Sequence, residues 1–263
     1  MQRTLNFLFN LGDEEERKEL SISFLVDLSG SMIGEPLEKV KEALISLLSP
    51  LVLDDDGASP GADQVNLFTF HSTVQSVSPW VNKEDFDFFS ECLLAIDNLA
   101  FTGSGATALY DGINACLDSF KNEKLKKSNE KIIVVFSDGG ENASTQNKRD
   151  IDLKIKAFAN GYLEKDDMAL AKNLDNSIRK RLFVSYSEDA EILIFNDDAQ
   201  QLLDSGDLIE NEKLRFKFID ILTSSRMPVK VYSLLYSFDD DDTYLHPGPL
   251  KDFADLSNGN IHV

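Results

Sequence analysis

Two runs of apolar residues, each closed by an aspartate, place the strongest constraint on how this chain folds. FLVD ends at Asp27, and IIVVFSD ends at Asp138. Strands without polar alternation are typical of parallel sheets that helices cover on both faces. The sequence therefore predicts two central parallel strands whose carboxyl ends each carry an aspartate.

The segments around these runs alternate between helix and strand patterns. EPLEKVKEALISLLS repeats its apolar residues at a spacing of three to four, which predicts an amphipathic helix. QVNLFTF and STVQSVSPW predict two strands joined by a tight turn, and ALYDGINACLDSF predicts a further helix. We therefore expect an α/β fold of the doubly wound, Rossmann-like kind: a mostly parallel central sheet with one antiparallel edge strand and helices on both faces.

A long irregular stretch interrupts this alternation. Between about Ala143 and Arg226 the chain is rich in charge, with two strand-like segments, RLFVSYS and EILIFND, between helical patterns. A connection of this length is unusual inside one compact domain. We expect a single domain over 1–263, with its core at about 20–142 and 214–263 and an inserted subdomain at about 146–213.

Small oxygen-bearing side chains follow the two apolar runs. Asp27 is followed by Ser29 and Ser31, and the glycine-rich loop TGSGAT ends at Thr107. Open parallel sheets bind ligands beyond the carboxyl ends of their strands, where the strand order reverses. If the first and fourth strands are neighbours at that point, these side chains converge with Asp138 in one crevice.

The chemistry of this group of side chains favours a hard cation. Two carboxylates and three hydroxyls, without His or Cys, favour Mg²⁺, with Mn²⁺ or Ca²⁺ as alternatives, over zinc. The alternate spacing of D-x-S-x-S lets one loop turn three side chains toward a point, and Gly30 and Gly34 permit that turn. The predicted metal ligands are Asp27, Ser29, Ser31, Thr107 and Asp138.

The motifs DLSGS, GATALYDG and FSDGGEN, in this order, resemble a complete metal-ion-dependent adhesion site (MIDAS) of von Willebrand factor A-type domains. In that family the five corresponding residues hold the metal. The resemblance implies a non-enzymatic adaptor or scaffold whose metal coordinates a glutamate or aspartate of a partner protein. Among bacterial intracellular members it also implies a pairing with a ring-forming AAA+ ATPase.

Other interpretations stay open on the sequence. A Mg²⁺-dependent, phosphatase-like hydrolase would use Asp27 as nucleophile, but Ser29 stands where such an enzyme needs a second acid. An extracellular adhesin is disfavoured because no signal segment is recognised, and because Cys92 and Cys116 resemble free buried thiols rather than a disulfide framework. The residues after the first strand could also cap a helix.

A formal charge of −20 limits the partners of the chain. Its field repels nucleic acid and anionic membranes, so we expect neither as a partner. No apolar run approaches the length of a membrane span. We therefore expect a cytoplasmic protein whose partner is basic or neutral overall and presents a single acid to the metal.

Three further features have a simpler interpretation. Trp80 is expected to pack inside the fold rather than to form a binding face. The basic islands at Lys154, Lys156 and 179–181 are expected to be solvated helix faces. The acidic run 239–242 lacks the glycine and the closing glutamate of a calcium loop, and it predicts a solvated loop.

Overall fold

The structure is a computed structural model that describes residues 19–53, 64–82, 86–100, 105–122, 125, 129–184, 192–235 and 248–262. Its internal contacts divide the chain into two compact units. The first unit comprises Met1–Ile151 and Val229–Val263, and the second comprises Asp152–Pro228. Each unit has a hydrophobic core of its own.

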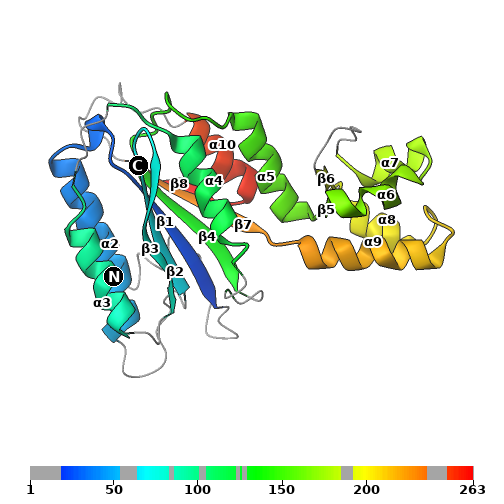
Figure 1. Cartoon of the computed structure of the whole chain (residues 1–263), viewed down its shortest axis with the longest axis horizontal. Coiled ribbons are helices and arrows are strands. Elements are labelled where there is room, and N and C mark those ends of the chain that lie inside the picture. The colour runs from blue at the N-terminus through cyan, green and yellow to red at the C-terminus, as the bar shows by residue number, and fades with distance from the viewer. Residues whose placement is uncertain are drawn as a thin grey trace. The chain divides into compact units, whose positions relative to one another are not determined.

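The first unit is built on a six-stranded sheet of order β3-β2-β1-β4-β7-β8 (Figure 1). β1 pairs in parallel with β2 and β4, and β7 pairs in parallel with β4 and β8. β3 runs antiparallel to β2 at one edge. The predicted sheet, mostly parallel with one antiparallel edge strand, is therefore confirmed. The strands are β1 (Leu20–Asp27), β2 (Gln64–Phe70), β3 (Val74–Asn82), β4 (Glu130–Ser137), β7 (Val229–Leu235) and β8 (Asn260–His262).

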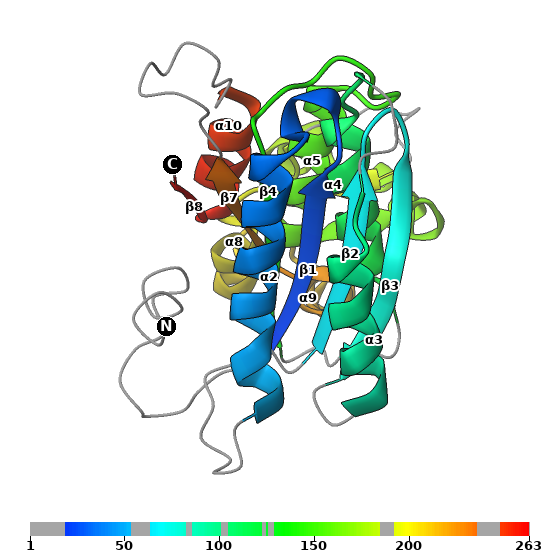
Figure 2. The ribbon, with the colours of Figure 1, turned by 90° about the vertical axis from the view of Figure 1, so that its left-hand side faces the viewer.

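Helices cover both faces of this sheet, as predicted. α2 (Glu35–Leu53) and α3 (Phe86–Asp97) lie in front of the strands in Figure 2, and α4 (Leu109–Ser119) lies behind them. α10 (Gly248–Ser257) shares the face of α4, since the rings of Tyr110 and Phe253 meet edge to face with centroids 5.9 Å apart. Because successive residues of a strand point to opposite faces, each strand contributes to both helical layers.

α4 lies unusually close to the centre of the sheet. A Cβ atom at Gly112 would lie 3.1 Å from both Cδ atoms of Leu25 and 3.4 Å from the ring of Phe70. All three residues are buried. Glycine at this position therefore allows the helix to approach β1 and β2, and it fixes the height of the helix above the sheet.

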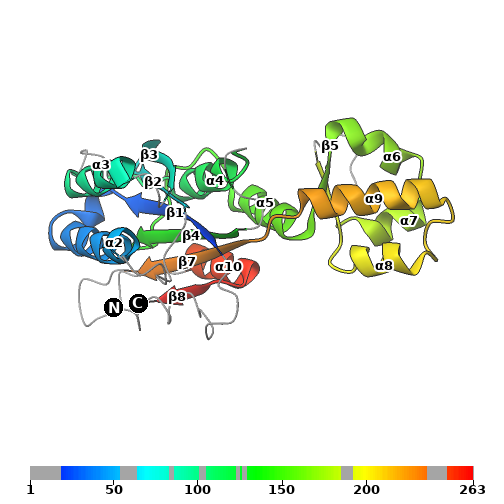
Figure 3. The same ribbon diagram turned by 90° about the horizontal axis from the view of Figure 1, so that it is seen from below.

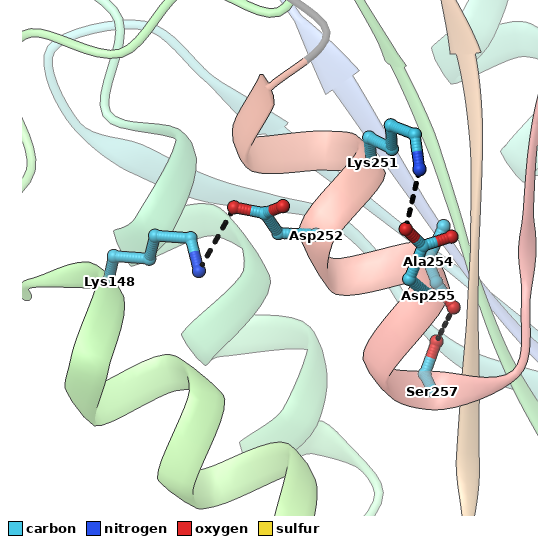
Figure 4. A network of polar contacts seen from close by, with 6 residues as sticks. All are labelled: Lys148, Lys251, Asp252, Ala254, Asp255 and Ser257. Atoms are coloured by element: carbon cyan, nitrogen blue, oxygen red, sulfur yellow. Dashed lines mark hydrogen bonds and ion pairs between the residues drawn. The ribbon is translucent and has the colours of Figure 1, made fainter.

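α10 is bound to the sheet and to the start of α5 (Lys148–Asn160). Val231 N donates to Ser257 Oγ at 2.8 Å, and Ser257 Oγ donates to the carbonyl of Ala254 at 3.2 Å. Figure 4 shows Lys148 Nζ of α5 directed at Asp252 Oδ2, 3.3 Å away. These contacts hold α10 between β7 and the first turn of α5.

The second unit packs several short elements around three phenylalanines. The rings of Phe183, Phe195 and Phe218 lie with centroids 5.1–6.5 Å apart. β5 and β6 form an antiparallel pair, and Figure 3 shows α6, α7 and α8 gathered around α9. The elements are β5 (Tyr162–Glu164), α6 (Met168–Lys172), α7 (Asn176–Leu182), β6 (Ile192–Ile194), α8 (Ala199–Ser205) and α9 (Glu212–Ser225), with short 3-10 turns at Lys165–Asp167 and, in the first unit, Gly30–Met32.

The borders of the second unit differ from the predicted insertion at 146–213. The helix LRFKFIDILTSS, which we assigned to the main fold from its sequence, is α9, and its Phe218 and Leu222 lie in the core of the second unit. Periodicity shows that such a helix has an apolar face, but not which core that face meets. The strand-like segment EILIFND contains β6, whereas RLFVSYS begins with the last residues of α7.

The segments that enter and leave the second unit are joined to each other by hydrogen bonds. Met227 N donates to the carbonyl of Phe158 at 2.7 Å, and Arg226 Nε donates to the carbonyl of Ala159 at 3.1 Å. The carboxyl end of α5 therefore lies beside the segment that follows α9.

Cys92 and Cys116 are free and buried, as expected. No helix within the described ranges is both long enough and apolar enough to cross a bilayer.

Candidate metal centre

The predicted ligands lie at one edge of the sheet because β1 and β4 are neighbours. Val26 of β1 pairs with Phe136 of β4, so Asp27 and Ser137 reach the same edge. Ser137 Oγ donates a 2.7 Å hydrogen bond to Asp27 Oδ2. β2 lies on the other side of β1, so the strand order reverses between β1 and β4, where the sequence predicted a crevice.

Asp27 is a fully buried carboxylate. Ser29 N donates to its Oδ1 at 2.7 Å. Burial raises the pKa of Asp27 from 3.8 to about 6; hydrogen bonds from Ser137 and Ser29 oppose this rise, and the charge of Asp138 adds to it. No cation among the described residues contributes to the shift. A buried carboxylate in this state is stabilised by any cation that lies beside it.

The two serines of D-x-S-x-S place their hydroxyls together. Ser29 Oγ and Ser31 Oγ are 3.1 Å apart, with Ser29 buried and Ser31 exposed. Ser29 precedes the 3-10 turn Gly30–Met32, but its side chain makes no capping hydrogen bond there. Helix capping therefore does not account for the Ser29 hydroxyl, which instead lies beside Ser31 Oγ and Asp27.

Thr107 and Asp138 both lie close to Gly140. A Cβ atom at Gly140 would lie 3.4 Å from Asp138 Oδ1 and 3.6 Å from Thr107 Oγ1. Gly140 N also donates to Asp138 Oδ1 at 3.1 Å. The absence of a side chain at Gly140 leaves the space beside these two oxygens open.

The loop of Thr107 also lies against the loop that carries the serines. The Cα atom of Gly105 is 3.6 Å from the position that a Cβ atom would take at Gly30. Three loops, which follow β1, precede α4 and follow β4, thus meet at this edge. These loops, with the end of β1, carry the five predicted ligands.

Sequence reasoning missed the side chains that hold these loops in place. The Glu141 carboxylate accepts from Ser144 Oγ at 2.7 Å and from Tyr110 N at 3.0 Å. Asp111 accepts from Thr145 N at 2.9 Å and from Gln146 N at 2.8 Å. The available signal was the run GGENASTQN after β4, since short polar side chains of this kind readily bond to neighbouring backbone.

A further bond joins the loop after β4 directly to a predicted ligand. Asn142 Oδ1 accepts from Thr107 N at 2.8 Å, and Asn142 N donates to the carbonyl of Thr107 at 2.9 Å. The backbone of Thr107 is therefore fixed by Asn142, while its hydroxyl stays on the side of Gly140.

The donor set fits a hard divalent cation that keeps some of its water. Two carboxylates and three hydroxyls are oxygen ligands of the type that Mg²⁺ takes at about 2.0–2.1 Å. Within the described ranges, no group of three or more His, Cys, Asp or Glu side chains is arranged to hold a metal. Any cation at this edge would therefore rely on hydroxyls as well as carboxylates. Thr102, the first residue of the TGSGAT loop, and the acidic run 239–242 lie outside the described residues.

Comparison with known proteins gives one family and several relatives. Residues 21–202, more than half of the chain, match the von Willebrand factor type A domain. The voltage-dependent calcium channel subunit alpha-2/delta-2 of Homo sapiens is 27% identical over 118 residues, 44% of this chain and 10% of the relative. Inter-alpha-trypsin inhibitor heavy chain H3 of Bos taurus is 23% identical over 159 residues, 59% of this chain and 17% of the relative. The chain thus spans a small part of these relatives.

Solved structures of similar chains were also found. The conserved hypothetical protein BatB from Bacteroides thetaiotaomicron is 13% identical with a TM-score of 0.47, over 92% of this chain and 88% of that chain. Proximal thread matrix protein 1 from the mussel byssus, solved with a zinc-occupied MIDAS motif, is 13% identical with a TM-score of 0.48, over 95% of this chain and 45% of that chain.

Proposed function

Because this chain belongs to the von Willebrand factor type A domain family, we propose that it is a metal-dependent protein-interaction module. The metal would be Mg²⁺, with Mn²⁺ or Ca²⁺ as alternatives, and an Asp or Glu of a partner protein would complete its coordination. The observation that supports this proposal is that buried Asp27 lies near Asp138, at the edge of the sheet where the loops that carry the three hydroxyls meet.

Two carboxylates of the chain would be ligands of the cation, and each is oriented by its own hydrogen bonds. Asp27 offers a carboxylate that Ser137 and the backbone of Ser29 keep in one orientation. Asp138, oriented by the backbone of Gly140, offers the second. A divalent cation beside two carboxylates is nearly neutral, and when bound it supplies a centre that still attracts an anionic oxygen.

The exposed side of the site gives the direction from which a partner would approach. Ser31 and Gly105 are exposed and Asp138 is half-buried, whereas Asp27 and Ser29 are buried. A partner carboxylate would therefore reach the metal past Ser31 and Gly105. The charge of −20 favours a partner that is basic or neutral around its single acid.

The proposal includes no catalytic residue. The relatives named above are a channel subunit and an inhibitor heavy chain, which supports a role in binding rather than in turnover. We further propose an adaptor or scaffold of the cytoplasm, with a ring-forming AAA+ ATPase as one candidate partner. An ATPase gene beside the gene for this chain would support that pairing.

The first test is direct binding of Mg²⁺ and Mn²⁺, measured by calorimetry. Wild type should bind one ion per chain, and Ser29→Ala and Asp138→Ala should weaken binding at least about tenfold, the loss that follows from removing a ligand oxygen. Asp255→Ala is the matched control, because it removes an exposed carboxylate of α10 that is not among the predicted ligands. Equal binding by all four proteins would refute the site.

The second test is capture of partners from native lysate with Mg²⁺ or with EDTA. A protein retained by wild type only with Mg²⁺, and by neither ligand variant, would be the expected partner. Retention that ignores both the metal and the mutations would show that binding occurs elsewhere on the chain.

A further inference from the structure

Two asparagines of the chain are each followed by glycine, at Asn160 and at Asn258. In an Asn-Gly pair the asparagine deamidates readily, because glycine has no side chain to hinder attack by its own backbone nitrogen. The two pairs have the same intrinsic chemistry. Any difference between them in the folded protein therefore comes from the structure around them.

Asn258 lies directly after α10, in the left-handed conformation with a φ of 56°. This is a common way for a helix to end at glycine or asparagine. The side chain of Asn258 is exposed. Gly259 N donates to the carbonyl of Ala254 at 2.9 Å, so the opening of this bond frees the nitrogen beside the Asn258 side chain.

The segment that follows Asn258 is also held by few contacts of its own. β8 is three residues long, and among the described strands it pairs only with β7. The last turn of a helix and a short edge strand open locally at a lower free energy than segments packed in a core. We therefore expect the reactive arrangement at Asn258 to be populated within the folded state.

Asn160 is held much more firmly. Its Nδ2 donates to the carbonyl of Phe195 at 3.1 Å and to Asp197 Oδ1 at 2.7 Å. The backbone beside it is enclosed, because a Cβ atom at Gly161 would lie 2.8 Å from the carbonyl oxygen of Leu222. The Asn160 side chain can turn toward Gly161 N only if several of these contacts are lost together.

We propose that Asn258 is a site of spontaneous deamidation in the folded protein, whereas Asn160 is protected. Gly259 N forms a bond to Asn258 Cγ, the proton of that nitrogen passes to the departing amide group, and ammonia leaves. This closes a five-membered succinimide ring. Water then opens the ring at either carbonyl and leaves aspartate or isoaspartate at position 258. The modification goes beyond the proposed metal-dependent function.

The product weakens the contact of α10 and β8 with β7. A carboxylate at the carboxyl end of a helix is unfavourable, because it lies at the negative end of the helix dipole. Isoaspartate also lengthens the backbone directly before Gly259, where even an added Cβ atom would overlap the carbonyl oxygen of Val231. Deamidation is thus an irreversible change at this edge of the sheet.

Peptide mass spectrometry of the full chain after incubation at pH 8 tests this proposal. Trypsin separates the two asparagines, because Lys156 and Lys165 flank the peptide of Asn160 and Lys251 precedes the peptide of Asn258. Incubation in heavy-oxygen water labels each hydrolysed succinimide. We expect the folded protein to convert Asn258 at least about tenfold faster than Asn160, which corresponds to about 1.4 kcal/mol between the two free energies of local opening.

Two controls accompany this measurement. In urea both asparagines should react at similar rates, because unfolding removes the protection of Asn160. Asn258→Gln should stay unmodified at this position, since its longer side chain would have to close a larger ring. Val231 N donates to Ser257 Oγ at 2.8 Å, and its hydrogen exchange should be faster in incubated wild type than in incubated Asn258→Gln protein.

Equal rates at the two asparagines of the folded protein would overturn the proposal. So would an unmodified Asn258 after a time in which the urea-unfolded chain reacts completely. Unchanged exchange at Val231 after full conversion would overturn the weakening of the contact with β7. Because no readout requires a metal, these results are independent of the fate of the metal site.

Discussion

At the scale of single residues, the burial of the Asp27 carboxylate is unfavourable for folding and points to a cation beside it. It is fully buried, it accepts hydrogen bonds from Ser137 and Ser29, and it lies near the second carboxylate Asp138. Its position is unfavourable for the fold alone and favourable for a cation. Residues kept at a cost to stability are characteristic of functional sites.

We predict that Asp27→Asn stabilises the metal-free protein at pH 8. The amide oxygen of the substituted side chain can still accept from Ser29 N, but no charge is buried. The folded pKa of Asp27 is raised, so wild-type stability falls as pH rises from about 4 to about 6. Two pKa units correspond to about 3 kcal/mol, the upper limit of the expected gain.

Urea unfolding in EDTA at pH 8 and at pH 3.5 measures this effect, and the two proteins should become equally stable at the lower pH. Added Mg²⁺ should stabilise wild type and leave Asp27→Asn unchanged. A variant less stable than wild type at pH 8 in EDTA would show that the carboxylate is compensated within the fold.

We predict that Glu141→Ala weakens Mg²⁺ binding although Glu141 is not one of the proposed ligands. Its carboxylate accepts from Ser144 and Tyr110, and so it joins the loop after β4 to the start of α4. Residues that orient ligands typically contribute about tenfold or more to affinity. Calorimetric titration checks this, with the exposed Glu164→Ala of the second unit as control. Unchanged affinity would mean that the loop holds its shape without Glu141.

At the scale of elements, the height of α4 above the sheet decides where Thr107 lies. Gly112 permits the close approach to Leu25, and the same helix begins two residues after Thr107. At its other end, α4 forms one wall of a cavity of about 440 Å³ that Asn66 and Trp80 also line, and the Trp80 ring packs on Phe120 as predicted. One helix therefore leads from the loop of Thr107 to this cavity.

We predict that Gly112→Ala destabilises the protein by about 1–3 kcal/mol, because over-packing at the buried Leu25 and Phe70 outweighs the gain of about 1 kcal/mol in helix propensity. Chemical denaturation measures the change. Gly248→Ala is the control, since no atom of the described residues lies within 4 Å of its added Cβ atom. A stabilised Gly112→Ala variant would show that the Leu25 side chain can shift to make room at little cost in free energy.

At the scale of the whole molecule, the chain consists of two units, and the metal site belongs to one of them. All five proposed ligands, with Ser137, Glu141 and Asn142, lie in the first unit. The second unit is folded around Phe183, Phe195 and Phe218. Stabilisation by a metal should therefore remain within the unit that binds it.

We predict that Mg²⁺ at about 100 times its dissociation constant stabilises the first unit by about 2.7 kcal/mol. Hydrogen exchange should show slower exchange in β1, β4 and α4, and unchanged exchange in α7, α8 and α9. Asp138→Ala should remove the difference. Equal protection of both units by Mg²⁺ would show that they unfold as one body.

The sequence allowed the sheet to be predicted, and with it the loops that carry the proposed ligands, because each has a local signature. Uninterrupted apolar runs mark buried parallel strands, and D-x-S-x-S marks a loop of small ligands. The partners of Glu141 and the cavity beside Asn66 were not predictable, since both depend on contacts between segments far apart in the chain. The place of α9 was missed for the same reason: its apolar face fits either core.

The hydrogen bond from Met227 N to the carbonyl of Phe158 has a consequence for how the chain can be altered. A segment whose two ends meet can be gained or lost as a cassette, because its removal leaves a gap that a short turn can close. An engineer could graft a reporter domain at the same junction.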